Sequence, residues 1–332
     1  MKNGQRTTNH FNSWINNSAI KKVWGILLAL IILVAVLGVV TDSFLTSQNI
    51  FNVTRQVAVN IFLTCGMTMA ILIAGIDLSV GSIIAVSACL CCGLVTNNGL
   101  PVGLAILLAI GAGTLVGAFN GFIISSTKIP PFIVTLGTMN ICRGFVRIYT
   151  DMATILVRDE TFTFIGTGKI VGGLPVQIIF IAIVIFIAWL ILYRTKFGRH
   201  IFAVGDNEQA AVFSGINVRK TKFLAYTLVG LFAACAGILS AARTHSALFN
   251  VGEGYEMDAI SAVVLGGTSM SGGVGTLGGS IIGALVIGVI TNGMNLIGID
   301  SSWQYVVKGC VLLLAVYLDY LRKKRYDDVI SG

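Results

Sequence analysis

Residues 23–40 read VWGILLALIILVAVLGVV, a run without any charged residue that directly follows Lys21 and Lys22. A run of this length suits a transmembrane helix, because a bilayer core of about 30 Å needs about 20 apolar residues. It is longer than the apolar region of a signal peptide, and no small-residue cleavage site follows it. We therefore expect an uncleaved first membrane span, preceded by a cytoplasmic tail at residues 1–22.

The rest of the chain is similarly apolar. Hydrophobic residues make up 55% of the 332 residues and charged residues 11%, whereas a soluble domain has about 25% charged residues. The sequence thus predicts an all-α polytopic membrane protein, with a transmembrane domain at 23–320 and a cytoplasmic tail at 321–332. The expected spans are 23–41, 57–75, 81–97, 101–125, 131–149, 176–193, 223–243, 258–270, 276–296 and 303–320.

The basic residues support this topology. If the N-terminus is cytoplasmic, fifteen of the 22 Lys and Arg residues fall in the tails and in the loops after even-numbered spans. Such an excess is typical of cytoplasmic segments. Both termini are therefore expected inside, with an even number of spans. Eight and ten fit this rule equally, and the segment lengths favour ten. The same reasoning assigns the positive charge to topology and not to a nucleic acid partner.

Two glycine-rich breaks interrupt the apolar segments, GIDLSVGS at 75–82 and GGTSMSGGVG at 266–275. Broken helices in the two halves of a transporter indicate an internal repeat with a translocation path near the interface of its halves. Glycine also permits plain close packing of helices, so both interpretations stay open. The segment 258–270 is short enough for a half-helix.

No catalytic or cofactor motif is visible. The chain lacks the nucleotide-binding pattern GxxxxGK[ST], and its three His residues have no partners at metal-ligand spacing. The seven Cys residues lie in or beside apolar runs, where they are expected to be buried apolar side chains. We expect no metal, no cofactor and no catalysis by this chain, so that any ATPase domain is on another chain.

The basic inside loop 194–222 contains a short helix signal. Asp206 or Asn207 can cap a helix over 207–214, Glu208 suits its first turn, and Gly215 suits its end. Such a helix is either a connector lying on the bilayer or a docking element for a cytoplasmic partner.

Asp77 is the most informative single charge, because an ionised carboxylate is costly in hydrocarbon. It is either a helix cap at the inner interface or part of a gate. Hydroxyl and amide groups in the spans could line a path for a hydroxylated solute or could bond neighbouring helices. These further candidates are Ser79, Asn120, Thr138, Asn140, Asn292, Asn295 and Gln304.

Several motifs together resemble those of bacterial ABC-type permeases that import ribose, galactose, xylose, arabinose, allose and related monosaccharides, and the ribose type is the nearest. The resemblance covers nearly the whole chain after about residue 24. Its motifs are 75–82, the loop 197–218 with AVGDNE at its centre, YEMDAI at 255–260, VLGGTS at 264–269, GGVGT at 272–276, NGMNL at 292–296, and WQY at 303–305 with Lys308 and Gly309.

The resemblance implies a permease subunit of the inner membrane that works by alternating access. It implies a second permease copy, usually identical, a cytoplasmic ATPase that binds ATP and Mg²⁺, and an extracytoplasmic sugar-binding protein. The ATPase would bind the 194–222 loop through Gly205, Asp206, Asn207, Glu208, Ala210, Ala211, Ser214 and Gly215. The sugar, and whether the permease pair is homomeric, stay open. The alternatives are a secondary carrier, which would need no partner chain, and a membrane-embedded enzyme.

Overall fold

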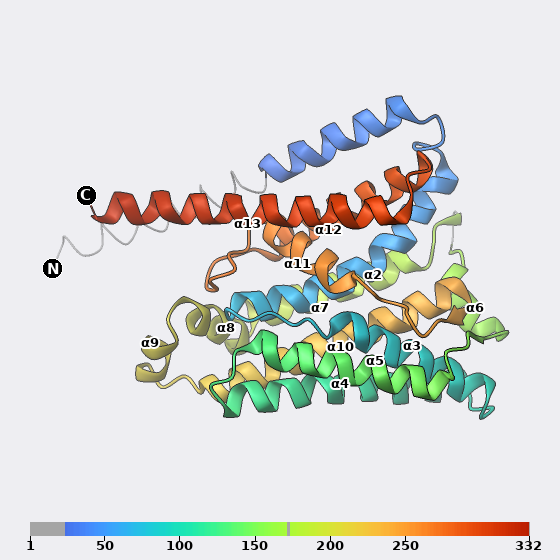
Figure 1. Ribbon diagram of the computed structural model, residues 1–332, viewed down its shortest axis with the longest axis horizontal. Coiled ribbons are helices and arrows are strands. Elements are labelled where there is room, and N and C mark those ends of the chain that lie inside the picture. The colour runs from blue at the N-terminus through green and yellow to red at the C-terminus, as the bar shows by residue number, and fades with distance from the viewer. Residues whose placement is uncertain (1–23, 171–172, 332) are drawn as a thin grey trace.

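The computed structural model describes residues 24–170 and 173–331, which form a bundle of long helices running roughly side by side (Figure 1). The helices are, in chain order, Trp24–Val40, α2 (Ser47–Leu72), α3 (Val80–Thr96), α4 (Val102–Ser126), α5 (Pro131–Thr150), α6 (Glu160–Thr167), α7 (Gln177–Trp189) with the π-helical turn η2 (Leu190–Arg194), α8 (Lys196–Asp206), α9 (Glu208–Phe213), α10 (Val218–Thr244), α11 (Tyr255–Leu265), α12 (Leu277–Leu296) and α13 (Ser301–Ser331).

A helix occupies each of the ten segments that the sequence predicts. Six described helices are long and apolar enough to cross a bilayer, namely α2, α4, α7 with η2, α10, α12 and the first part of α13. The all-α polytopic class is therefore confirmed, whereas the number ten stays a prediction. α11 has only 11 residues, as expected for a half-helix. The expected tail 1–22 lies outside the described residues, and the segment 321–331 continues α13.

Small residues set the helix packing. α10 packs against α2, α3 and α4 at the centre of the bundle. Gly113, Gly117 and Gly121 follow one another at intervals of four on the face of α4 that meets α10. A Cβ atom at Gly117 would lie 2.7 Å from the Cα atom of Gly230. Glycine thus lets the two backbones approach closely, as in small-xxx-small pairs of membrane helices, which explains much of the glycine content.

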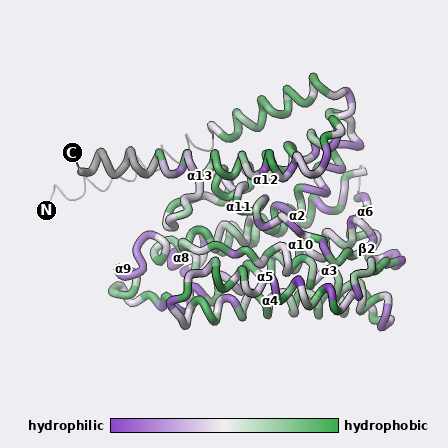
Figure 2. The backbone as a smooth tube through the Cα atoms, viewed as in Figure 1, coloured by the Kyte–Doolittle hydropathy of each residue, from purple (hydrophilic) through white to green (hydrophobic). Residues whose placement is uncertain are grey.

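The molecule has two polar ends with an apolar body between them (Figure 2). α8 and α9 lie at one end, and α6 lies at the other (Figure 1). At the α6 end, strand β1 (Ile155–Leu156) pairs antiparallel with β2 (Ser246–Ala247), so that Ile155 faces Ala247. This strand pair between distant segments and α6 were not predicted, because the 150–175 segment has no clear hydrophobic period.

Candidate functional site

The two glycine-rich breaks lie against each other. The amide nitrogen of Gly273, in the second break, donates over 2.9 Å to the carbonyl oxygen of Leu72, the last residue of α2, three residues before the first break. Gly272 and Gly273 have φ angles of 85° and 71°, a conformation that glycine adopts without strain. Segments about 200 positions apart in the sequence are therefore joined backbone to backbone.

The C-terminal end of α8 meets the breaks at the same point. A Cβ atom at Gly205 would overlap with the carbonyl oxygen of Leu72 and would lie 2.6 Å from the amide nitrogen of Gly273. A Cβ atom at Gly272 would likewise lie 2.8 Å from the carbonyl oxygen of Gly205. We call Leu72, Gly205, Gly272 and Gly273 the glycine junction. It joins the predicted coupling loop to the second break and to the end of α2, which leads into the first break.

Two further contacts hold the second break from its other sides. The carboxylate of Asp319, on α13, accepts from the Ser269 hydroxyl at 3.3 Å and from the Met270 amide at 3.4 Å. The Tyr193 hydroxyl, in the π-helical turn, accepts from the Leu277 amide at 3.0 Å. The end of α8, the π-helical turn after α7, the start of α12 and the middle of α13 thus meet around one short glycine-rich segment.

Asp77 lies in the first break and is completely buried. Its Oδ1 atom accepts from the amide of Ser79 at 2.8 Å and from the Ser79 hydroxyl at 2.6 Å. The Asn120 amide, on α4, donates to the same hydroxyl at 2.9 Å. The structure therefore brings three of the candidate residues into one hydrogen-bonded group, which Thr135 on α5 joins through the Leu78 amide at 3.1 Å.

This group retains unpaired polar atoms. Asp77 Oδ2, Asn120 Oδ1 and the Tyr226 hydroxyl are buried and have no partner among the described residues. Each such atom costs about 1–3 kcal/mol in a closed protein interior. The unpaired carboxylate oxygen fits a gate, and the bonds from Ser79 at the start of α3 fit a helix cap, so both interpretations of Asp77 stay predictions.

The other candidate residues do not join this group. Asn292 makes a reciprocal buried amide pair with Asn49, at 3.0 Å in each direction. The Gln304 amide donates to Asn295 Oδ1 at 2.7 Å. Thr138 and Asn140 bond to carbonyl oxygens of their own helix α5. The eight candidates are thus divided among separate places in the chain and do not line one continuous path within it.

The predicted helix in the 194–222 loop is present as α9. Asn207 caps it by accepting from the Ala210 amide at 2.9 Å, and Gly215 follows it with a φ of 77°. Glu208 forms an ion pair with Lys222 at 2.7 Å. Asp206, Ala210 and Ser214 are exposed, whereas Gly205 and Ala211 are buried. The last two can therefore contribute to the fold of the loop but cannot contact a partner directly.

The last two residues of α9 are large and apolar, and the sequence did not predict their exposure. Phe213 is 90% exposed and Val212 is 56% exposed. Both lie inside the predicted helix 207–214, but nothing in its local pattern indicates that they are exposed. An exposed aromatic at the tip of a short helix is a typical anchor for a protein partner.

A buried ion pair was also missed. Lys308 Nζ, on α13, lies 2.8 Å from Asp258 Oδ2, on α11, and the two side chains are 18% and 4% exposed. Both residues belong to quoted motifs, and the signal that could have found them is a pair of opposite charges in two apolar segments. Such charges in membrane helices are expected to be paired.

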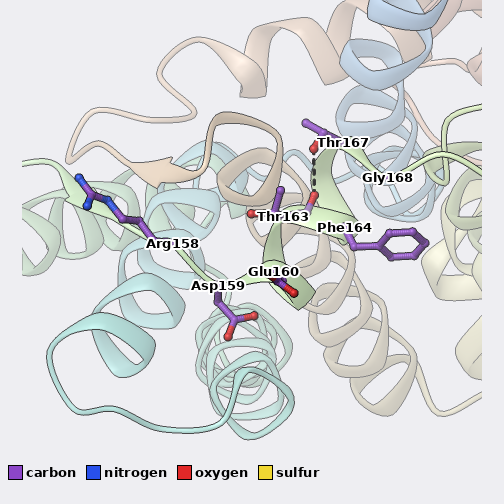
Figure 3. A pocket seen from close by; sticks show the side chains of 7 residues that line it. All are labelled: Arg158, Asp159, Glu160, Thr163, Phe164, Thr167 and Gly168. Atoms are coloured by element: carbon purple, nitrogen blue, oxygen red, sulfur yellow. Dashed lines mark hydrogen bonds between the residues drawn. The ribbon is translucent and has the colours of Figure 1, made fainter.

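At the opposite end of the molecule, α6 borders an open cavity of about 360 Å³ (Figure 3). Asp159 is occupied in capping α6, since its Oδ1 atom accepts from the amides of Thr161 and Phe162. Glu160 and Arg158 are exposed, as is Phe164 on the same side of the helix. Phe162 is fully buried and fixes α6 to the bundle. The result is a firmly held helix with a charged and aromatic surface.

The chain is similar to known permeases over most of its length. Residues 49–316 match the family model described as branched-chain amino acid transport system / permease component. The chain is 46% identical to the ribose import permease protein RbsC of Bacillus subtilis, over 90% of this chain and 92% of that protein. It is 41% identical to the Escherichia coli protein of the same name, over 88% and 92%.

A third relative is the galactose/methyl galactoside import permease protein MglC of Escherichia coli, which is 36% identical over 91% of this chain and 96% of that protein. No solved structure matches the chain. The family model covers well over half of the chain, and each of these relatives covers about nine-tenths of it. The chain therefore belongs to the branched-chain amino acid transport system / permease component family, whose members are transport subunits and not enzymes.

Proposed function

We propose that this chain is the membrane-spanning permease subunit of an ATP-driven monosaccharide importer of the ribose type. The observation that carries the proposal is the exposed tip of α9, Val212 and Phe213, which stands directly beyond the glycine junction. The relatives named for ribose and galactose support a sugar as the substrate. ATP and Mg²⁺ would be bound by a separate ATPase chain that docks on this tip.

We further propose that the α8–α9 end faces the cytoplasm, as do both termini. Arg194, Lys196 and Arg199 lie at this end, as do Arg219, Lys220 and Lys222. Such an excess of basic residues is typical of cytoplasmic segments in inner-membrane proteins. The α6 surface would then face outwards and receive the sugar-binding protein.

A second copy of the chain would cover part of α5. Gly137 and Gly144 have open space where a Cβ atom would be, and the Asn140 side chain between them is exposed. Small residues and amides at such a surface favour close association of helices in a membrane. A pair of chains facing each other through α5 would place the two Asn140 amides along a shared path.

The proposal is tested by uptake of labelled ribose in cells that lack their own ribose importer. Uptake is expected only when the chain is expressed with its ATPase and its binding protein. Phe213→Ala should weaken ATPase binding by at least about tenfold, because buried aromatic anchors dominate such interfaces. Phe164→Ala is the matched control, since Phe164 is 52% exposed on α6, at the end of the molecule opposite to α9 (Figure 1). Uptake by this chain alone would show a secondary carrier and would refute the proposal.

Asp77→Ala is expected to lower ribose uptake by about tenfold while the amount of protein in the membrane stays close to wild type. The change removes the acceptor of two short hydrogen bonds in the first break, each with a charged group and therefore stronger than an ordinary one. Asp300→Ala is a matched control, because Asp300 accepts from the Ser302 amide at the same 2.8 Å but is exposed. A collapse in the amount of Asp77→Ala protein would instead identify Asp77 as a structural cap.

A further inference from the structure

We propose that a polar cavity between α2, α11, α12 and α13 binds one monosaccharide directly, as a subsite of the permease itself. The cavity has a volume of about 210 Å³. Pockets for drug-sized ligands have about 300–1,000 Å³, so this cavity suits a ligand of about one ring. The proposal rests on the proposed function as a sugar importer.

The walls of the cavity carry donors and acceptors for a neutral, hydroxylated ligand. Gln56 and Asn60 face it from α2, Thr291 from α12 and Gln304 from α13. Asn60 is only 6% exposed, and its side chain has no hydrogen bond to another described residue. An amide can both donate and accept, as recognition of sugar hydroxyl groups requires.

The cavity also contains an unsatisfied acceptor and aromatic surface. Asp258 is 4% exposed, and its Oδ1 atom has no partner among the described residues, whereas Oδ2 is paired with Lys308. A buried acceptor of this kind is unfavourable unless a ligand or water bonds to it. Tyr255 and Tyr305 add rings, which can cover the apolar face of a sugar while the hydroxyl groups reach polar partners.

The charges favour a neutral ligand. Asp258 and Lys308 compensate each other within the wall, and Glu253 lies exposed at the mouth. α12 ends and α13 begins at the end of the molecule opposite to α8 and α9 (Figure 1). With the proposed orientation, the cavity is reached from outside, where the binding protein would release its sugar.

Binding is measured by equilibrium dialysis of tritiated D-ribose against the purified full-length chain in lipid nanodiscs, without the binding protein or ATPase. Saturable, weak binding is expected for the wild type. Asn60→Ala and Gln304→Ala should each weaken binding by about fivefold, as loss of one hydrogen bond does. Gln304 lies partly exposed at the cavity wall, so its variant is testable even if Asn60→Ala does not fold. Asn98→Ala, an exposed amide in the α3–α4 loop, should bind like the wild type.

Absence of saturable ribose binding, binding as strong as that of the wild type in both cavity variants, or preferential binding of leucine would each overturn this proposal. ATP-dependent ribose uptake by the complete transporter is measured on the same preparations. Normal uptake without binding by the isolated chain would reject the subsite and leave the importer intact. Uptake without the ATPase would reject the importer function, whatever the dialysis shows.

Discussion

Gly205→Ala is expected to abolish ATP-dependent uptake, although it adds only one methyl group. The new Cβ atom would overlap with the Leu72 carbonyl oxygen and lie 2.6 Å from the Gly273 amide nitrogen. Both neighbours are backbone atoms and cannot turn aside as a flexible side chain can. Forcing extra volume into a packed site typically costs about 1–3 kcal/mol and shifts the backbone. Here the shift is expected to separate α8 from the end of α2 and from the second break, so that movement of the proposed ATPase partner would no longer reach them.

Uptake, copurification of the ATPase and the amount of monodisperse protein are measured together. Gly103→Ala is the control, because nothing lies within 4 Å of its Cβ position on α4, and alanine is the better helix former. The expected pattern for Gly205→Ala is a folded protein that retains its ATPase but transports no sugar. Uptake at the wild-type rate would refute a coupling role for the glycine junction. Loss of the folded protein would show that the junction is only a packing contact.

Lys308→Met is expected to destabilise the protein by about 3–5 kcal/mol. The substitution leaves the Asp258 carboxylate, 4% exposed, as a buried charge without its cation, which is the unfavourable way to break an ion pair. The effect is measured as a fall in the thermal unfolding midpoint in detergent. Lys220→Met, at an exposed lysine in the first turn of α10, should leave the midpoint unchanged.

The double variant Lys308→Met with Asp258→Leu identifies the cause. Replacing a buried ion pair by apolar side chains of similar volume is often neutral or stabilising. The double variant should therefore recover most of the stability that Lys308→Met loses. If it is no more stable than Lys308→Met, the loss comes from packing around α11 and α13 and not from the isolated carboxylate.

The long helices could be predicted because a bilayer imposes one simple pattern, an apolar run of sufficient length. The start of α2 could not be predicted in this way. α2 begins at Ser47, ten residues before the predicted start at 57, because polar residues in its first turns find partners inside the protein. Asn49 pairs with Asn292 across 243 positions, and no local pattern reports a contact of that separation.

The site was predictable in part for the same reason. The breaks and the α9 helix have local signals in glycine, Asn207 and Gly215, and both are present. That the breaks meet each other and α8 depends on tertiary packing alone. The amphipathic helix α8 (Lys196–Asp206) was missed, because Gly198 and Gly205 inside it argue against a helix. Both glycines are needed there for close contact with neighbouring carbonyl oxygens.

The glycine junction consists of backbone contacts and contains almost no side-chain chemistry. A contact of this kind transmits displacement but cannot distinguish one partner from another. In the proposed transporter, recognition of the ATPase therefore resides in the side chains of α9, such as Phe213. The glycine junction does not depend on which side chains α9 carries. Substitutions in α9 can consequently change which ATPase the permease binds without altering the glycine junction that transmits the movement.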